Sequence, residues 1–577
     1  MVRKAMKFTP EVMLSAPRRS PGIPNPKGDT VVYTSSTYDF QTHKKDSVLR
    51  IVDIRTGDGQ DLVTDKEVSS LNWLDNERFV FLQSERDGVT SLCIGSIPWN
   101  PKVSAGTAKS DIYVAGSIDA PAGDLRVTRS ASQGSEFSVV FSAKAAPNGD
   151  LYNPERAKKT QSTGRLYSSL YVRHWDAYEG SEKNALWYGQ LAKSHDGKYK
   201  LSHVFNVLSG TGLESPMPPF GGIDNFDVYG NCIIFVAKDP DLDPALNTKA
   251  NVYIARLWDV GPSPTIERVI IPGFEGASSS PVISPDGSKA AFLSMKKNGY
   301  EADRNEVFVV GPLHGRKLTA KRVPSTWREN EWTWDRSPGS ICFSADSKCL
   351  FAVAEECGSA KLFSFSADLA HPSNIRALTD GGAVADVRPL SNGSVFVSGS
   401  TLVDNSFFAI IDAKKAQESD VNTEDLVSWS NSMSDYGSKF HLSSNQVSSI
   451  WTPASNPEVL KKIHSIVVKP NDFDSSATYP VAYLIHGGPQ GSWADTWSTR
   501  WNPAVFAEQG YIVVAPNITG STGYGQDFTD SIRENWGGDP YQDIVNCFEW
   551  VSENMPEADN SRAVALGASY GGYMANW

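Results

Sequence analysis

A serine between small residues stands near the end of the sequence, directly after a short apolar run. Residues 563–566 read Ala-Val-Ala-Leu, and the motif that follows is Gly567-Ala568-Ser569-Tyr570-Gly571-Gly572. A nucleophilic serine has to be lifted out of a sheet on a tight strand-to-helix turn, where only small flanking residues fit because the two backbones nearly touch. The pattern therefore predicts Ser569 as an activated nucleophile.

This motif needs support from a second motif, because a G-x-S-x-G pattern arises by chance about once in every few chains of this length at roughly 7% Gly and 7% Ser. Its alternative interpretation is a surface loop. The apolar residues 481–485 run directly into His486-Gly487-Gly488-Pro489, about eighty residues before Ser569. An α/β-hydrolase places its oxyanion loop at this point of the chain, so the two motifs in this order predict that fold.

The predicted geometry assigns roles to three residues. The hydroxyl of Ser569 attacks a carbonyl carbon, and the backbone N–H groups of Tyr570 and Gly488 are the candidate donors to the resulting oxyanion. His486 is a tempting general base, but the triad of this fold runs Ser, Asp, His along the chain. We therefore expect a structural role for His486.

The acid and base partners of Ser569 are not found in the sequence that follows it. Residues 570–577 contain neither Asp nor His, and all nine histidines precede Ser569. We expect the triad Asp and His to lie outside this chain and the hydrolase domain to be incomplete. We also expect residues 1–577 alone to be inactive and poorly soluble, with an apolar strand edge at residues 563–566.

Two regions of the sequence have different patterns. After an N-terminal segment of residues 1–20, residues 21–445 consist of short β-type runs separated by turn residues. The clearest runs are residues 31–33, 50–54, 79–82, 233–236 and 307–310. Turns are predicted at residues 25–28, 194–197, 284–287, 344–347 and 390–393.

The spacing of these turns indicates a repeated β unit. Asp286 and Asp346 are 60 residues apart, and Asp346 and Asn392 are 46 residues apart. These spacings are close to one four-stranded propeller blade, and seven blades fit into residues 21–445. The alternative is a pair of β-sandwiches.

Residues 446–577 alternate between predicted strands and helices. Residues 463–468, 481–485 and 511–515 are apolar runs without polar alternation, which is typical of buried strands. Between residues 540 and 553, apolar side chains recur at helical spacing on one face. The pattern predicts a parallel sheet covered on both faces.

Composition excludes several classes of protein. Hydrophobic residues make up 40% of the 577 residues, charged residues 21%, and the formal net charge is −12. The acidic balance gives no reason to expect nucleic acid or an anionic membrane surface as a partner. The six cysteines form no CxxC pair, so their spacing indicates neither a zinc site nor a dense disulfide framework, and we expect most of them to be buried thiols.

The start of the sequence bears on its location in the cell. Basic residues within positions 1–7 are followed by Thr9, Pro10 and Glu11, where a secretory signal would need an apolar run. No stretch reaches about 18 consecutive apolar residues, so no membrane span is predicted. We expect a cytoplasmic protein, or a secreted one if translation starts elsewhere.

The chain resembles the fungal dipeptidyl-peptidase V branch of the prolyl oligopeptidase family over nearly its whole length. The most specific stretches are residues 486–501, 517–525 and 536–538 and the motif around Ser569. Further similar stretches are residues 15–19, 171–176, 218–222 and 300–303.

The resemblance implies a seven-bladed propeller capping the hydrolase and release of dipeptides from free peptide amino termini, without a metal or organic cofactor. It assigns the nucleophile to Ser569 and the oxyanion positions to Tyr570 and Gly488. An acidic side chain of the propeller should bind the substrate ammonium, and Glu301 and Glu214 are candidates because they lie beside family-like motifs. The oligomeric state is not predicted.

Two alternatives remain open. An acylaminoacyl-peptidase or an oligopeptidase on the same fold would keep Ser569 and change only what recognises the amino end of the substrate. A non-catalytic propeller that binds other proteins would follow if the chain had no triad partners at all.

Overall fold

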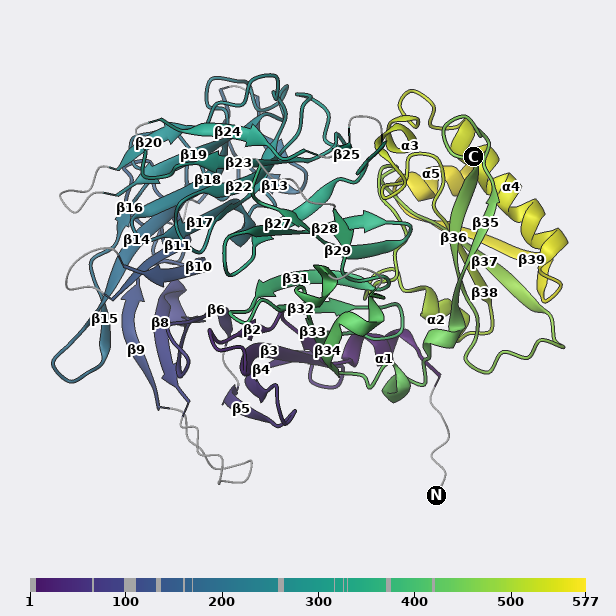
Figure 1. Ribbon diagram of the computed structural model, residues 1–577, viewed down its shortest axis with the longest axis horizontal. Helices are drawn as coiled ribbons and strands as arrows, with labels where there is room; N and C mark the ends of the chain where they lie inside the picture. The colour runs from purple at the N-terminus through teal and green to yellow at the C-terminus, as the bar shows by residue number, and fades with distance from the viewer. Residues whose placement is uncertain are drawn as a thin grey trace.

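The structure is a computed structural model with a β-rich part followed by an α/β part (Figure 1). It describes residues 7–64, 67–97, 111–130, 136–158, 161–168, 170–257, 264–315, 317–324, 326–328, 331–369, 375–417 and 421–577. None of the helices in these ranges is both long and apolar enough to span a bilayer.

The first three sheets of the β-rich part follow one another along the chain, each built from antiparallel neighbours. The first contains β1 (Arg18–Arg19), β2 (Ile23–Pro24), β3 (Thr30–Asp39), β4 (Lys44–Asp53) and β5 (Gly59–Thr64). The second contains β6 (Val68–Trp73), β7 (Arg78–Ser84), β8 (Thr90–Ser96) and β9 (Asp111–Ile118). The third contains β10 (Ala122–Arg129), β11 (Phe137–Ala145), β14 (Lys183–Lys193), β15 (Tyr199–Leu201) and β16 (Phe205–Asn206).

Two further four-stranded sheets and one eight-stranded sheet complete this part. They contain β17 (Phe226–Tyr229), β18 (Cys232–Lys238), β19 (Ala250–Arg256) and β20 (Thr265–Arg268), then β21 (Ser278–Ile283), β22 (Ala290–Ser294), β23 (Glu306–Gly311) and β24 (Thr319–Arg322). The eight strands are β27 (Pro338–Phe343), β28 (Cys349–Glu356), β29 (Ser359–Ser366), β30 (Arg376–Ala377), β31 (Ala383–Pro389), β32 (Val395–Ser400), β33 (Phe407–Ile411) and β34 (Val427–Ser432). One parallel residue pair, Ala360 with Ala383, joins its two four-stranded halves.

Two short hairpins are inserted in this part, one between β11 and β14 of the third sheet and one between β24 and β27. They are β12 (Arg173–His174) with β13 (Ala177–Tyr178), and β25 (Thr326–Arg328) with β26 (Glu331–Thr333).

All five predicted turns are confirmed. In each one the N–H of the fourth residue donates to the carbonyl of the first at 2.8 or 2.9 Å. The turns at residues 284–287 and 344–347 join the first two strands of a sheet. The other three join β2 to β3, β14 to β15 and β31 to β32. The turn motif therefore marks a hairpin in every case, but it does not occupy the same position in every sheet.

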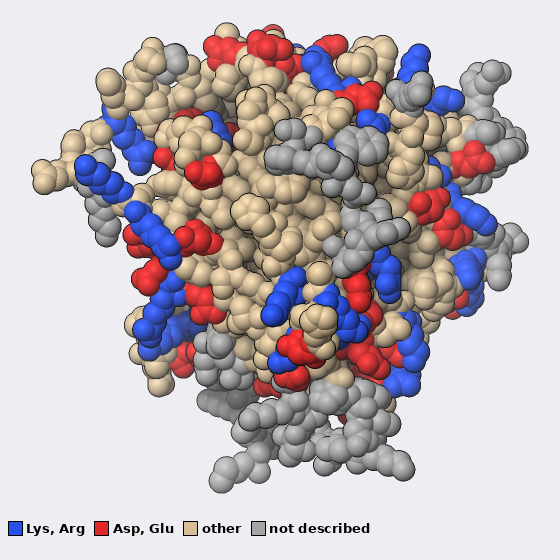
Figure 2. All heavy atoms as spheres, turned by 90° about the vertical axis from the view of Figure 1, so that its left-hand side faces the viewer, with Lys and Arg blue, Asp and Glu red and all other residues tan. Residues whose placement is uncertain are grey.

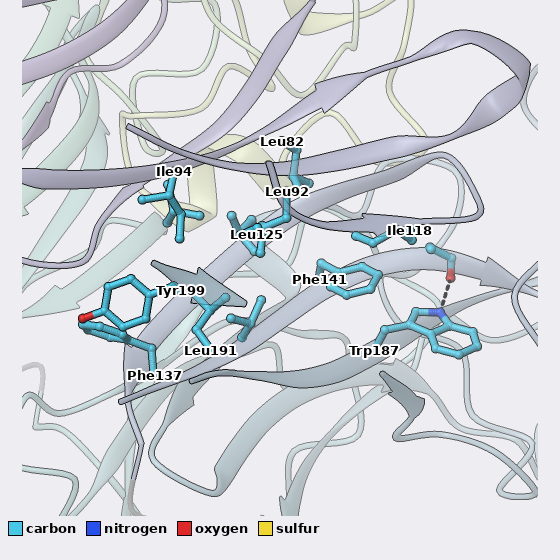
Figure 3. Close-up of a cluster of buried hydrophobic side chains, with 14 of the residues drawn as sticks. Leu82, Leu92, Ile94, Ile118, Leu125, Phe137, Phe141, Trp187, Leu191 and Tyr199 are labelled. Carbon is cyan, nitrogen blue, oxygen red and sulfur yellow. Dashed lines mark hydrogen bonds between the residues drawn. The ribbon is translucent and has the colours of Figure 1, made fainter. Parts of the chain in front are cut away.

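Consecutive sheets pack face to face through apolar side chains. Figure 3 shows the cluster between the second and third sheets, where Leu82 and Leu92 approach Phe141 and Trp187. The indole N–H of Trp187 is satisfied within this core by the carbonyl of Ala143 at 3.1 Å. Similar clusters join the later sheets.

The last sheet also contacts the first. Val31 and Tyr33 of β3 pack in one buried cluster with Phe396 of β32 and Phe408 of β33. This contact brings the two ends of the β-rich part together, although the residues are more than 350 positions apart in the sequence.

Figure 2 shows the face of the β-rich part that lies on the left of Figure 1. Basic and acidic side chains stand next to one another around its rim, and a broad area with few charges lies between them. Among the described residues on this face, neither sign of charge forms a continuous patch.

The α/β part has one sheet in the order β35-β36-β38-β37-β39. Its strands are β35 (Val447–Pro453), β36 (Lys462–Val468), β37 (Tyr479–Ile485), β38 (Ile512–Pro516) and β39 (Ala558–Gly567). Its helices are α2 (Pro503–Ala507), α3 (Gln526–Asp530), α4 (Asp539–Asn554) and α5 (Tyr570–Asn576). The helix expected at residues 540–553 is confirmed as α4.

The prediction of a parallel sheet is wrong for one of these strands, β36. β38, β37 and β39 run parallel, but β36 pairs antiparallel with both β35 and β38. The physical reason is the connection: a parallel neighbour needs a long crossover, whereas only a short loop joins β35 to β36. The expected cover on both faces is present, with Ala507 of α2 on one side and Val551 of α4 on the other.

Strand β39 is the edge strand of this sheet in the described part of the chain. It pairs with β37 on one side. Val564 and Leu566 on it are 41% and 37% exposed. The expected apolar edge at residues 563–566 therefore corresponds to an exposed stretch of strand.

The two parts are joined by buried contacts on the side of α1 (Pro10–Ser15). Asp495 accepts the backbone N–H of Leu402 at 2.8 Å and that of Gly382 at 3.1 Å, so one carboxylate of the α/β part holds two loops of the β-rich part. Beside it, the fully buried ring of Phe8 lies 5.4 Å from Trp497. The N-terminal segment thus packs against both parts.

Candidate active site

Ser569 stands on the turn between β39 and α5, as the sequence predicts. Its φ of 57° and ψ of −125° lie in a region that residues other than glycine rarely adopt. The turn is held by α5, in which the N–H of Tyr573 donates to the carbonyl of Ser569 at 3.1 Å. Such a strained conformation is what a serine on a strand-to-helix turn requires.

Gly567 and Gly571 make this turn sterically possible. A methyl group on Gly567 would lie 2.2 Å from the carbonyl oxygen of Gly571, and one on Gly571 would lie 2.1 Å from the carbonyl oxygen of Ile485. Both neighbours are backbone atoms of packed elements, which cannot move aside. Helix α5 therefore begins in direct contact with the end of β37.

The loop of residues 486–491, called the oxyanion loop below, leaves the sheet beside the serine. Ile485 pairs with Gly567 across parallel strands, so His486 and Ala568 leave the sheet at the same edge. A methyl group on Gly487 would lie 3.4 Å from the Cβ of Ser569. The two motifs, which are far apart in sequence, are therefore in contact.

The two backbone groups predicted as oxyanion donors are free. In the described ranges neither the N–H of Gly488 nor that of Tyr570 donates a hydrogen bond. Gly488 has a φ of +125°, a conformation that favours glycine. Both donors are thus available to a ligand, and their role remains a prediction.

His486 is occupied by other partners. Its Nδ1 lies 2.7 Å from the carbonyl of Gly487, so Nδ1 carries the proton, and its Nε2 lies 2.9 Å from the hydroxyl of Ser521. Burial lowers the pKa of His486, which keeps the ring neutral. The Ser569 hydroxyl has no hydrogen-bond partner in the part of the chain that the structure describes, so this geometry is consistent with a structural role for His486.

A buried polar network supports the chain that follows the oxyanion loop. The side chain of Asn517 accepts from the N–H of Trp493 at 2.7 Å and donates to its carbonyl at 3.0 Å. Asn517 also donates to the hydroxyl of Tyr524, which lies 2.6 Å from Nδ1 of His464. Burial lowers the pKa of His464 to about 4. Neither the Asn517 nor the His464 contact was predicted.

Two cavities lie near these residues. One of about 390 Å³ is lined by Ser569, His486 and the side chains of Trp493 and Trp501. The other, of about 750 Å³, lies between the two parts of the molecule and is called the interdomain cavity below. Its lining includes Gly488 and Gln490 from the oxyanion loop and Tyr171, His174, Trp175 and Glu301 from the β-rich part.

The two candidate ammonium ligands have different surroundings. Glu301 is exposed to the interdomain cavity and makes no hydrogen bond or ion pair within the described residues. Glu214 lines a neighbouring cavity of about 220 Å³, where it accepts from the N–H of Asn184 at 2.9 Å and lies 3.3 Å from Lys183. Burial raises the pKa of Glu214. Glu301 is therefore the carboxylate that is free to bind a cation.

No group of three or more His, Cys, Asp or Glu side chains in the described ranges is arranged to hold a metal ion. None of the six cysteines, all of which lie in the described ranges, forms a disulfide, and three of them are buried. The independence from metals and cofactors stays a prediction for experiment.

Comparison with known proteins gives relatives of two kinds. Residues 497–577 match the prolyl oligopeptidase family. A probable dipeptidyl-peptidase 5 of Aspergillus clavatus is 38% identical over 588 residues, which cover 99% of this chain and 77% of that protein. A dipeptidyl-peptidase 5 of Trichophyton tonsurans is 36% identical over 591 residues, with 99% and 76% covered.

Solved structures share the fold at low identity. The acylaminoacyl peptidase of Pyrococcus horikoshii has a TM-score of 0.68 at 13% identity, over 99% of this chain and 76% of its own. An acylaminoacyl peptidase in complex with Z-Gly-Gly-Phe-chloromethyl ketone also has a TM-score of 0.68, at 14% identity, with 99% and 76% covered. A puromycin hydrolase reaches 0.55 at 14% identity, over 98% and 76%.

The contact at Gly571 predicts strong sensitivity to one added methyl group. We expect Gly571→Ala to lower the free energy of unfolding by about 1–3 kcal/mol or more, because the methyl overlaps the carbonyl of Ile485. Gly339→Ala is the matched control, since a methyl there meets nothing within 4 Å. Chemical denaturation of both variants measures the difference, and equal stabilities would contradict the close contact.

The surroundings of His464 predict a dependence of stability on pH. The unfolded chain binds a proton at His464 below a pKa of about 6.5, whereas the folded state binds it only near 4. The contribution of His464 to the free energy of unfolding is therefore fully present above pH 6.5. It is lost as the pH falls towards 4, by an amount on the order of 3 kcal/mol. In His464→Asn the slope of unfolding free energy between pH 6.5 and 4 should flatten, while His195→Asn at an exposed site should not change it. An unchanged slope in His464→Asn would show that this histidine is not responsible.

Proposed function

This chain belongs to the prolyl oligopeptidase family of serine peptidases, beside the fungal dipeptidyl-peptidase 5 proteins, and from this premise we propose that it releases dipeptides from free peptide amino termini through an acyl-enzyme on Ser569. Its substrates are peptides, as expected for a member of this family. The observation that carries the assignment is the contact of the strained Ser569 turn with the oxyanion loop.

The geometry supports the following chemistry. The Ser569 hydroxyl attacks the carbonyl carbon of the substrate's second residue, and the oxygen of that carbonyl becomes negatively charged. The N–H groups of Gly488 and Tyr570 donate to this oxygen, and a fixed donor of this kind is worth about 10²–10³-fold in rate. Collapse of the tetrahedral intermediate expels the remaining peptide as an amine, which takes up the proton that the general base removed from Ser569. The dipeptide is left as an ester on Ser569, which water then hydrolyses.

The proton of Ser569 has to be taken by a general base. We assign this role to none of the described residues, because His486 is bonded to Ser521 and Gly487 and no histidine in the described ranges hydrogen-bonds Ser569. The acid that orients the base is likewise unassigned.

We also propose that residues 21–445 form a seven-bladed β-propeller, and residues 446–577 part of an α/β-hydrolase domain. The order of the sheets supports the blade number when the two halves of the eight-stranded sheet count as separate blades. The packing of β3 against β32 and β33 supports closure of the ring. Residues 1–20 form the N-terminal segment, whose Phe8 packs against both domains.

Recognition of the substrate amine is proposed to reside in the interdomain cavity. The carboxylate of Glu301 lines this cavity together with Gly488 and forms no ion pair among the described residues, although Arg173 and Lys238 line the same cavity. A charge-assisted bond between a carboxylate and the substrate ammonium would require a free amino terminus. Glu214 is less suited because Lys183 already neutralises it.

An acylaminoacyl-peptidase is the second candidate, favoured by the likeness in fold to the Pyrococcus horikoshii enzyme. Such an enzyme would keep Ser569 and accept a blocked amino terminus. Hydrolysis of a dipeptide naphthylamide and of its N-acetylated counterpart separates the two candidates, because only an enzyme that binds the ammonium needs the free amine.

Loss of the nucleophile should abolish activity without a role for metal. In the full-length protein, Ser569→Ala is expected to reduce kcat by a factor approaching about 10⁶, since the covalent route is lost. Ser476→Ala, on the surface of the same domain, is the matched control, and a chelator should change neither protein. Retained turnover in Ser569→Ala, or inhibition by the chelator alone, would rule out the serine mechanism.

Neutralising the proposed ammonium ligand should weaken binding of free-amine substrates. Glu301→Gln is expected to raise KM for a dipeptide naphthylamide by roughly tenfold or more, because a hydrogen bond to a charged group contributes about 1.5–3 kcal/mol. Glu214→Gln and the exposed Glu553→Gln should change KM little. If Glu214→Gln has the larger effect, the ammonium binds in the smaller cavity instead.

A further inference from the structure

Tyr300 connects the two domains at the interdomain cavity. It lies in the turn between β22 and β23 of the propeller, immediately before Glu301. Its hydroxyl donates to Oδ1 of Asp530 in α3 at 2.6 Å and accepts from Nε2 of Gln490 in the oxyanion loop at 2.7 Å. One phenol therefore bonds two separate segments of the hydrolase domain.

Burial and the bond to Asp530 raise the pKa of Tyr300. The phenol consequently remains protonated over the range in which peptidases are assayed. Its single proton goes to the carboxylate, and its lone pair is left to the amide of Gln490. The guanidinium of Arg533 lies over the same ring at 4.8 Å. These contacts restrict the ring to one position.

The turn that carries Glu301 is held by the same helix. Nε2 of Gln526 donates to the carbonyl of Ala302 and to Oδ1 of Asp530, both at 2.8 Å. Tyr300 and Ala302, the two neighbours of Glu301, are thus both bonded to α3 or to its end. The backbone of Glu301 has little freedom to move relative to the hydrolase domain.

The oxyanion loop is also fixed from within its own domain. The N–H of Thr522 donates to the carbonyl of Gly491 at 3.1 Å, and Gln490 donates to Thr529 at 3.3 Å as well as to Tyr300. Removing the Tyr300 hydroxyl would therefore leave the donor Gly488 in place. The separation between this donor and Glu301 would no longer be fixed.

We propose that Tyr300 is a positioning residue that sets the separation between Glu301 and Gly488 and thereby fixes the length of the released peptide at two residues. The inference rests on the proposed function, in which Glu301 binds the substrate ammonium and Gly488 binds the oxyanion. With both ends of the acyl part held, only one peptide bond can reach Ser569. A propeller turn that shifts by about 1 Å misplaces that bond, which can cost up to about 10²-fold in rate.

The test compares the peptides released by full-length wild-type protein and by Tyr300→Phe. An unblocked decapeptide is digested, and the products are identified by mass spectrometry at early times. Wild type should release dipeptides. Tyr300→Phe should release tripeptides or single residues beside dipeptides, and its kcat for a dipeptide naphthylamide should fall by about 10–100-fold. Hydrolysis of a small ester without an amine should change less than twofold.

Two further variants separate this role from a general effect on folding. Tyr436→Phe is the matched control, because that hydroxyl bonds Ser430 at 2.6 Å inside the propeller and is expected to change nothing. Asp530→Asn should also release tripeptides or single residues beside dipeptides, but in a smaller proportion than Tyr300→Phe. In Tyr300→Phe combined with Glu301→Gln, the losses should be less than additive, since the tyrosine acts through the glutamate.

The outcomes distinguish this inference from the function on which it rests. If wild type does not release dipeptides, the proposed function fails. If wild type and Tyr300→Phe both release only dipeptides with the same kcat, the positioning role is refuted while the function stands. The same holds if the losses in Tyr300→Phe and Glu301→Gln are fully additive in the double variant. An equal loss of small-ester hydrolysis would also refute it, since Tyr300 would then act on Ser569 or its oxyanion donors.

Discussion

The site depends on one backbone contact, at the point where α5 begins against the end of β37. Gly571 lies so close to the carbonyl of Ile485 that no side chain fits between them, and this contact sets the position of the strained Ser569 above the sheet edge. Because Ile485 is also the last residue before the oxyanion loop, the contact fixes the nucleophile and the loop relative to each other. Electrostatic stabilisation of an oxyanion requires such a fixed arrangement, since donors that must first reorganise contribute less to the rate.

In the proposed function the β-rich part contributes the other end of the site, and its placement depends on contacts between the two parts. On one side, Asp495 accepts two propeller N–H groups and Phe8 is buried between the domains. On the other side, the contact of Tyr300 with Asp530 is polar, and the neighbouring Glu301 lines a cavity of about 750 Å³. The first side combines an apolar cluster with the two hydrogen bonds of Asp495, whereas the second consists of polar contacts. Polar contacts of this kind can fix the position of a substrate-binding turn while contributing little to the free energy of unfolding.

Much of the fold could be predicted from the sequence because its patterns are local. The five predicted turns, the strands and the helix α4 follow from neighbouring residues, and the turn at Ser569 follows from its glycines. The antiparallel pairing of β36 could not be predicted, because it depends on which connection lacks a helix. The bond of Tyr300 to Asp530 joins residues 230 positions apart, and the choice between Glu301 and Glu214 depends on Lys183. No sequence pattern marks contacts of this kind.

The most direct test of the account is the crystal structure of the full-length protein after reaction with a dipeptidyl phosphonate that carries a free amine. The account predicts a covalent bond from phosphorus to the Oγ of Ser569. It also predicts that the phosphonyl oxygen lies within hydrogen-bond distance of the N–H groups of Gly488 and Tyr570, and that the ammonium faces Glu301. A phosphonate bonded to another residue, or an oxygen that points away from both N–H groups, would contradict the account.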